Sequence, residues 1–310
     1  MNRFIRLRLL AMLLCLPFLL IFISGCGSSS QKKDEPPVYS PLQVLVPEAT
    51  GKETIGSSPM ILDVSNISQG YFIAQSDSSD LTCSLQIISP SGALYSYFIA
   101  PGESATVTFT EGSGDYTITG YQQVQGDQYA ALYSETVTVQ LENDFLPFLY
   151  PNQYVNFSPD SEASKLALSM VSEDTTDVDA LKQIYNYVVN NLTYDYDKAE
   201  TVETGYLPDV DETLSTKTGI CFDYAALTTA MLRSCDIPCK LQIGYTGDIK
   251  HAWIDVYIRS KGWVTGAVSF NGDSWSLMDP TFDSSADSDD TEAIQDYIGN
   301  ADNYTVQFTR

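Results

Sequence analysis

The stretch that decides the fold is "TGICFDYAALTTAMLRSCDIPCKLQIGYTG", residues 218–247, which predicts a loop, a helix and a strand in succession. Gly219 permits a tight turn, and the run from Cys221 to Ser234 consists mostly of apolar and small residues, with Pro238 just beyond its end. Cys221 therefore falls on the first turn of the predicted helix. Because the free amides and the dipole of a helix start favour a thiolate, we expect a lowered thiol pKa there, which makes Cys221 a candidate nucleophile.

His251 is the only histidine of the chain, and it opens the stretch "HAWIDVYI" (251–258). The stretch alternates in the manner of a β-strand, with one apolar face formed by Ala252, Ile254, Val256 and Ile258. His251 and Trp253 project from the other face. An ordinary core histidine is the alternative interpretation, but a place outside the apolar row favours an imidazole that works as an acid or base.

The third candidate is Asp279, at the end of the short predicted strand in "SWSLMDPTFD" (274–283) and directly before Pro280. An aspartate before a proline is often a turn former. An aspartate on a strand near His251 can instead accept a hydrogen bond from one imidazole nitrogen and fix its tautomer. The residues leave both interpretations open.

Taken together, these segments give a cysteine at a helix start, a histidine on a strand and an aspartate at a strand end. In this order the chain resembles the transglutaminase-like superfamily of papain-type thiol enzymes. The resemblance rests on "GICFDYA" (219–225), "LRSCDIPCKLQIGY" (232–245), "HAWIDVY" (251–257) and "MDPTFD" (278–283), and it covers roughly residues 160–283.

The resemblance implies a papain-like α+β domain with Cys221, His251 and Asp279 as a catalytic triad. Cys221 would attack a protein or peptide amide to give a thioester, which water or an amine then resolves. The Cys221 amide would be one oxyanion donor. The second donor stays open between Tyr194, Tyr196 and the 205–218 loop.

Two further expectations accompany the resemblance. Trp253 and Tyr224 are predicted to contact the substrate. One departure from the family pattern is the longer stretch before Asp279, "SKGWVTGAVSFNGDSWSLMDP", which we interpret as an extended hairpin.

The N-terminus predicts export. Residues 1–25 combine three arginines with an apolar run and are typical of a signal peptide. The following "ISGCGSSS" resembles a bacterial lipobox, which predicts lipidation of Cys26; an ordinary signal peptide or an uncleaved anchor are the alternatives. We therefore expect an extracytoplasmic lipoprotein attached to the bacterial cell membrane.

Composition divides the rest of the chain into three parts. Residues 26–55 are rich in Ser, Pro, Lys and Glu and predict a flexible tether of low order. Residues 56–143 contain seven short runs of strand-forming residues separated by turn signals, which predict an immunoglobulin-like antiparallel β-sandwich. Two prolines near residue 147 mark the boundary to the α+β domain, residues 144–310.

Charge and residue counts exclude several classes of function. Without residues 1–25 the chain keeps 13 basic against 40 acidic residues, a charge of −27, which would repel nucleic acid. One histidine and the spacing of "CDIPC" (235–239) argue against a zinc site, so no metal or cofactor is expected. The expected partners are a protein or peptide substrate and the membrane, through the lipid anchor. The pairing of Cys235 with Cys239 stays open.

Two functions of different class remain. The first is a surface-anchored cysteine peptidase or transglutaminase-type acyltransferase. The second is a non-catalytic binding or structural module that uses the same fold as a scaffold. The presence of all three of Cys221, His251 and Asp279 argues against it, because a non-catalytic module has no chemical need for them.

Overall fold

The computed structural model describes residues 33–270, 275–277 and 304–310. By backbone contacts the chain divides into Met1–Ser30, which lies outside the described residues, and Gln31–Arg310, which contains every element below. Cys26 and Asp279 also lie outside the described residues. Among the helices that are described, none combines the length and the apolar composition that a membrane span needs.

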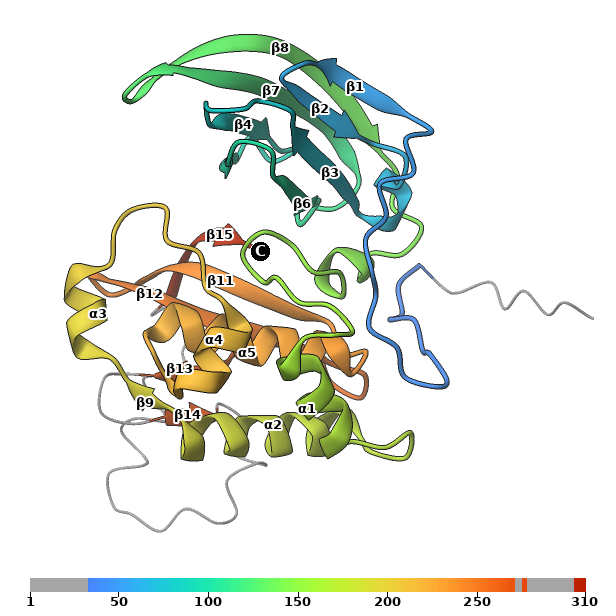
Figure 1. The fold of residues 1–310 in the computed structure, drawn as a ribbon. Coiled ribbons are helices and arrows are strands. Elements are labelled where there is room, and N and C mark those ends of the chain that lie inside the picture. The colour runs from blue at the N-terminus through green and yellow to red at the C-terminus, as the bar shows by residue number, and fades with distance from the viewer. Residues whose placement is uncertain (1–32, 271–274, 278–303) are drawn as a thin grey trace, which may run out of the picture. The chain divides into compact units, whose positions relative to one another are not determined.

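The first half of the chain forms two antiparallel four-stranded sheets (Figure 1). One sheet has the order β1-β2-β3-β6 and the other the order β5-β4-β7-β8. The strands are β1 (Thr54–Ser57), β2 (Met60–Asp63), β3 (Tyr71–Ser76), β4 (Cys83–Ile88), β5 (Leu94–Ile99), β6 (Ser104–Thr108), β7 (Gly114–Gln125) and β8 (Gln128–Val139).

The two sheets share one hydrophobic core. Alternate residues of β2, such as Met60 and Leu62, pack in the same cluster as Leu85 of β4 and Ile118 of β7, and all four side chains are buried. The sequence predicted seven strands in this region, and the structure has eight. The immunoglobulin-like topology stays a prediction.

The segment before β1 differs from its prediction. Composition predicted low order over residues 26–55, yet residues 33–50, which we call the strap, pack along the rest of the chain. Pro36 and Pro37 are buried, and Val44 joins the core of the second half of the chain. Adjacent prolines lose little conformational entropy when the segment becomes ordered, and burial of the apolar Val44 side chain stabilises the folded chain. Composition alone does not reveal that Val44 is buried.

The second half of the chain contains the helices. They are α1 (Glu162–Met170), α2 (Asp177–Asn191), α3 (Tyr196–Thr201), α4 (Val210–Thr216) and α5 (Cys221–Ser234), after the short 3-10 helix η2 (Leu146–Phe148). Helix α5 has the bounds that the sequence predicted. At the start of α2 the Thr176 side chain caps the helix by accepting the Asp179 N–H at 3.1 Å.

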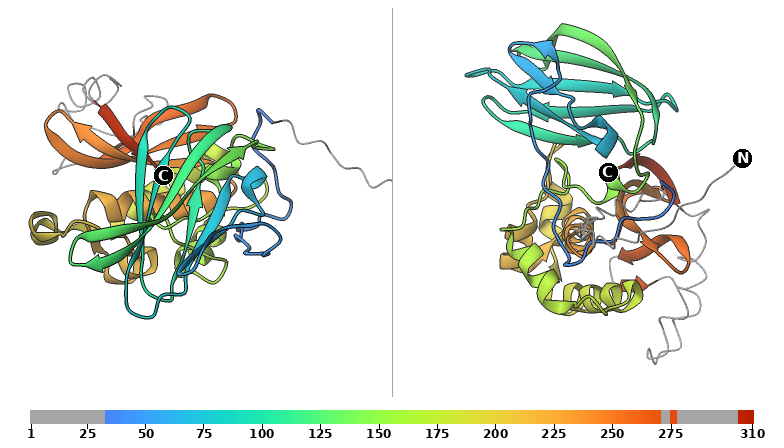
Figure 2. Two further views of the ribbon diagram at one scale, coloured as in Figure 1. Left: turned by 90° about the horizontal axis from the view of Figure 1, so that it is seen from above. Right: turned by 90° about the vertical axis from the view of Figure 1, so that its right-hand side faces the viewer.

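A five-stranded antiparallel sheet accompanies these helices, in the order β14-β13-β12-β11-β15. Figure 2 shows β15, drawn in red, beside the orange strands of this sheet. The strands are β11 (Cys239–Thr246), β12 (Ile249–Ile258), β13 (Gly262–Phe270), β14 (Trp275–Leu277) and β15 (Tyr304–Thr309).

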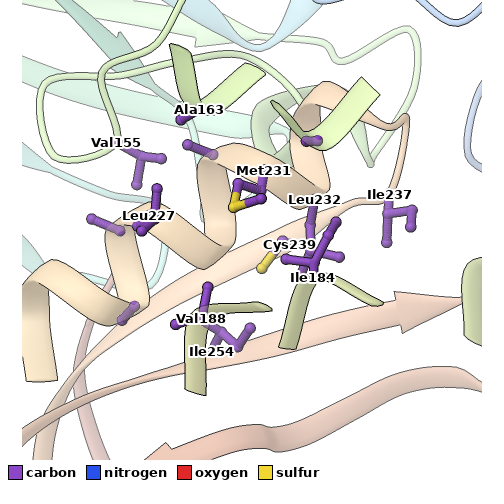
Figure 3. Packing of buried hydrophobic residues seen from close by; sticks show 14 of the residues in the cluster. Val155, Ala163, Ile184, Val188, Leu227, Met231, Leu232, Ile237, Cys239 and Ile254 are labelled. Carbon is purple, nitrogen blue, oxygen red and sulfur yellow. The ribbon is translucent and has the colours of Figure 1, made fainter. Parts of the chain in front are cut away.

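Helix α5 lies at the centre of this half, and every residue from Asp223 to Ser234 is buried. Its side chains pack against α2 and against the apolar face of β11 and β12, with Ala163 of α1 on another side of the helix (Figure 3). The cluster includes Leu227, Met231 and Leu232 of α5, Ile184 and Val188 of α2, and Cys239 and Ile254 of the sheet. A helix packed on all sides fixes the position of its first residue, Cys221.

Arg233 ties the end of α5 to its surroundings. Its guanidinium is buried and donates to the carbonyl oxygens of Cys239 at 2.8 Å, Tyr150 at 2.7 Å and Arg310 at 2.9 Å. Burial lowers the pKa of Arg233 to about 10, which leaves the side chain protonated at neutral pH. This one side chain therefore links α5 to β11, to Tyr150 ahead of α1 and to Arg310 after β15.

Candidate active site

Cys221 is the first residue of α5, preceded by Ile220 in an extended conformation. It is partly buried, whereas the other cysteines of the described residues, Cys83, Cys235 and Cys239, are buried. All four are free, so Cys235 and Cys239 do not form a disulfide. Cys221 is therefore the thiol of this set that a reagent or substrate reaches most readily.

The turn before Cys221 is shaped by Asp223. Its carboxylate accepts the Ile220 N–H at 2.8 Å, which satisfies one of the free amides of the helix start. A Cβ at Gly219 would lie 2.6 Å from the Asp223 Cβ, closer than side chains approach. Glycine is thus required at this position for a steric reason. Within "GICFD" the Asp223 side chain packs against Gly219 and bonds the Ile220 N–H, so these residues depend on one another.

Strand β12 brings His251 to the same region. On β11, Leu241 exchanges both backbone hydrogen bonds with Arg310, at 2.9 and 2.8 Å. Two residues further along the strand, the backbone N–H and C=O of Ile243 therefore also point toward β15. Its partner across β11 and β12, Ala252, therefore directs its N–H away from β11. That N–H hydrogen-bonds the Cys221 sulfur, which places Cys221 beside the residue that follows His251.

The predicted face of β12 is confirmed. The His251 and Trp253 rings stack with centroids 6.2 Å apart and planes at 17°. The Ala252, Ile254 and Val256 side chains belong to the core beneath α5. His251 is thus not part of the apolar row.

Burial dominates the electrostatics of both groups. It raises the pKa of Cys221, an effect that hydrogen bonds from Ala252, Phe222 and the Tyr194 side chain offset in part. It lowers the pKa of His251 to about 4. The sequence predicted a depressed thiol pKa, and this is wrong for the structure described: at neutral pH both groups are uncharged, because desolvation outweighs the helix start.

Tyr194 stands out among the three sources considered for a second oxyanion donor. Strand β9 (Thr193–Tyr194) pairs in parallel with β10 (Thr218–Gly219), which directly precedes Ile220 and Cys221. Hydrogen bonds join the Tyr194 side chain to both the thiol and the backbone of Cys221. Tyr196 is instead 58% exposed.

Several other predicted site residues are placed differently or not at all. Tyr224 and Trp253, the expected substrate contacts, are 2% and 1% exposed. Direct contact with a substrate would require them to move, and that role stays a prediction. Asp279 and Cys26 lie outside the described residues.

The strand before Asp279 is described in part. Strands β13 and β14 pair as an antiparallel hairpin, with Phe270 opposite Trp275, as the extended-hairpin interpretation predicted. Strand β13 lies between β14 and β12 in the sheet. The strand that leads to Asp279 is therefore one strand removed from the strand of His251.

No metal site is found among the residues that the structure describes: none of their His, Cys, Asp and Glu side chains form a group of three or more suited to an ion. The chemistry available from these residues is that of a thiol at the start of α5 and a neutral imidazole on β12, with a backbone N–H and a phenol hydroxyl next to the sulfur.

Residues 164–266 match the model of the transglutaminase-like superfamily. This segment is a transglutaminase-like domain. The domain includes Cys221 and His251, whereas Asp279 lies beyond the matched residues.

The chain also has relatives among curated proteins. The UPF0252 protein MJ1282 of Methanocaldococcus jannaschii is 40% identical over 62 residues, which are 18% of this chain and 18% of that protein. The uncharacterized protein YebA of Bacillus subtilis is 26% identical over 175 residues, which are 49% of this chain and 23% of YebA. The matches thus span about a fifth of the length of these two relatives.

Two solved structures show a more distant likeness. A candidate cysteine protease from Cytophaga hutchinsonii is 17% identical, with a TM-score of 0.33 over 68% of this chain and 77% of that one. A candidate protease from Parabacteroides distasonis is 14% identical, with a TM-score of 0.29 over 60% of this chain and 38% of that one.

Proposed function

We propose that the chain is a thiol enzyme that acts on protein or peptide amide bonds, with Cys221 as nucleophile, His251 as acid and base, and Asp279 as the residue that orients His251. The observation that carries the proposal is the bond from the Ala252 N–H to the Cys221 sulfur. This bond places the partly buried cysteine of the helix start against the strand of the one histidine.

The mechanism starts from the neutral pair. His251 takes the thiol proton as the sulfur attacks the amide carbonyl, and the imidazolium then protonates the leaving amine. The thioester is resolved when His251 activates a second nucleophile. Water gives hydrolysis, and a primary amine gives acyl transfer.

The negative oxygen formed in each step needs hydrogen-bond donors. The Cys221 N–H and the Tyr194 hydroxyl lie next to the sulfur and are the donors that we assign to this role. Because the Tyr194 side chain bonds to Cys221 in the resting protein, its hydroxyl must turn from the cysteine toward the substrate oxygen.

The cellular setting is part of the proposal. Export through residues 1–25 and lipidation of Cys26 would hold the enzyme at the outer face of the cell membrane, and an immunoglobulin-like sandwich formed by β1–β8 would act as a spacer or as a binding module. Labelling of cells with a fatty-acid analogue tests this: the label should enter the membrane-bound chain and be absent from Cys26→Ser.

The reaction is tested with a glutamine-containing peptide, with and without a primary amine. Ammonia, amine incorporation and backbone cleavage are followed separately, which identifies the acceptor. Cys221→Ala and His251→Gln should each reduce the rate on the order of 10³-fold or more. Cys235→Ala, a buried cysteine at the other end of α5, is the matched control and should keep the activity. No product from any substrate, under conditions where Cys221 is accessible, would favour the non-catalytic module.

A further inference from the structure

The carboxylate of Asp223 is buried two residues after the nucleophile, with no exposed surface. It accepts the Ile220 N–H at 2.8 Å and the Lys198 ammonium at 2.7 Å, and it also accepts the Tyr206 hydroxyl. A buried carboxylate is stable when its charge is paired and its oxygens are hydrogen-bonded. Asp223 therefore has the environment of a charged group that the fold retains at the helix start.

Lys198 and Tyr206 belong to a separate part of the chain. Lys198 lies in α3, and Tyr206 follows in the segment that leads to α4. The Lys198 ammonium donates to the Tyr206 hydroxyl at 2.7 Å and lies 4.4 Å from the centre of its ring. With Asp223 the two side chains form a closed network of three partners.

The same segment is fixed to the strand before Cys221. The Asp195 side chain caps α3 by accepting the Lys198 N–H at 2.8 Å. The Asp195 N–H donates to the Gly219 carbonyl at 2.9 Å. The network and this backbone bond therefore hold both sides of the turn that carries Cys221.

Charge adds to the geometry. The negative charge of Asp223 disfavours a thiolate at Cys221, and the ammonium of Lys198 compensates that charge at contact distance. Loss of Lys198 would leave the carboxylate uncompensated beside the nucleophile. Loss of the Asp223 charge would instead leave an ammonium there, which favours the thiolate.

We propose that Lys198 and Tyr206 are positioning residues for Cys221, and that they act through the buried carboxylate of Asp223. The proposal deepens the proposed thiol chemistry and rests on it for the role of Cys221 in turnover. The position and the ionisation of the thiol, however, are measurable without any substrate.

The test is the rate of alkylation of Cys221 by iodoacetamide in the full chain, measured from pH 6 to 10. The titratable groups that interact with the thiol are Asp223 on α5 and Tyr194 on β9. Lys198 and Tyr206 bond to Asp223, and His251 lies on β12. Lys198→Met should raise the apparent pKa of Cys221 by about one unit, a tenfold lower thiolate fraction at neutral pH. Lys198→Arg keeps the charge and should restore the profile. Lys217→Met, an exposed lysine ahead of β10, is the control.

Asp223→Asn provides the opposite sign. The amide oxygen can still accept the Ile220 N–H, but the negative charge is gone, so the apparent pKa of Cys221 should fall. In the double variant with Lys198→Met the two shifts should largely cancel, because both opposite charges of the ion pair are then removed. If Lys198→Met does not fold, Asp223→Asn alone still shows whether the charge of Asp223 raises the apparent pKa of Cys221.

Tyr206→Phe changes no charge and tests positioning. It should leave the apparent pKa in place and lower kcat several-fold with KM unchanged, whereas the control Tyr129→Phe, on β8 in the first half of the chain, should alter neither. The proposal is overturned if Lys198→Met and Asp223→Asn lower thermal stability but leave the alkylation profile unchanged, which is the behaviour of a purely structural network. Absence of turnover in the unmodified protein would instead contradict the proposed function and leave the alkylation result to stand by itself.

Discussion

The backbone N–H of Ala252 hydrogen-bonds the sulfur of Cys221. This contact joins the start of α5 to β12 at the residue that follows His251. The two residues are separated along the chain by the rest of α5 and by β11, and their contact follows from the register of β11 and β12. Four predictions about the site and its support follow from the surrounding geometry.

Cysteine labelling under native conditions should select Cys221. It is partly exposed, whereas Cys83, Cys235 and Cys239 are buried. Because burial raises the pKa of Cys221 above its ordinary value of 9.0, the labelling rate should keep rising as the pH passes 9. Mass spectrometry of peptides after iodoacetamide treatment measures this. In urea all four should react, and equal labelling of Cys235 in the native protein would contradict the structure.

The protonation of His251 should weaken the fold in acid. The folded pKa is about 4, and the ordinary value is 6.5, so between these values the unfolded chain binds the proton and the native protein does not. Stability from this group is complete above pH 6.5 and is lost as the pH falls to 4, by up to about 3 kcal/mol. Urea unfolding of the unmodified protein and of His251→Gln at pH 4 to 7 tests this, since the variant should lack that part of the pH dependence.

Asp236 should have the opposite effect. Burial raises its pKa from 3.8 to about 7, although the Tyr39 N–H of the strap and the charge of Arg259 lower it in part. The native protein therefore holds a proton that the unfolded chain has lost, and stability falls as the pH rises from 4 through 7, by up to about 4 kcal/mol.

Asp236→Asn isolates this term. Asp236 has a φ of 57°, which asparagine tolerates, and the amide oxygen can accept the Tyr39 N–H that the carboxylate accepts at 3.2 Å. Relative to the unmodified protein the variant should gain stability with rising pH. Asp127→Asn, at an exposed turn, should not, and identical pH profiles for both variants would show that Asp236 ionises normally.

Gly219→Ala should disturb the turn before Cys221 by steric overlap. The new methyl group would lie 2.6 Å from the Asp223 Cβ and 2.9 Å from one carboxylate oxygen. We expect a loss of about 1–3 kcal/mol and slower alkylation of Cys221, because the Asp223 side chain must move away from the Ile220 N–H. Gly126→Ala, in an open turn with a φ of 55°, should lower stability without affecting Cys221. Thermal unfolding and the alkylation rate separate the two effects.

Local pattern sufficed for the elements that carry the site. The apolar and small-residue run with Pro238 beyond its end predicted α5 with its actual bounds, and alternation in 251–258 placed His251 and Trp253 on one face of β12. Both signals depend on periods of 3.6 and 2 residues, which neighbouring residues express whatever the rest of the chain does. The motifs around Cys221, His251 and Asp279, in that order along the chain, likewise indicated the transglutaminase-like domain.

The tertiary structure decided the quantities that depend on distant residues. Desolvation reversed the expected direction of the Cys221 pKa and made His251 a weak base, since burial is set by the packing of whole elements. The strap packs against the rest of the chain because Val44 joins the core of the second half and the Pro37 carbonyl accepts a hydrogen bond from Arg259. Lys198 and Tyr206 carry no motif, and their link to Asp223 exists because the fold brings α3 and the following segment to the start of α5. Period and composition describe what a segment can form, and long-range burial and charge pairing determine what its side chains then do.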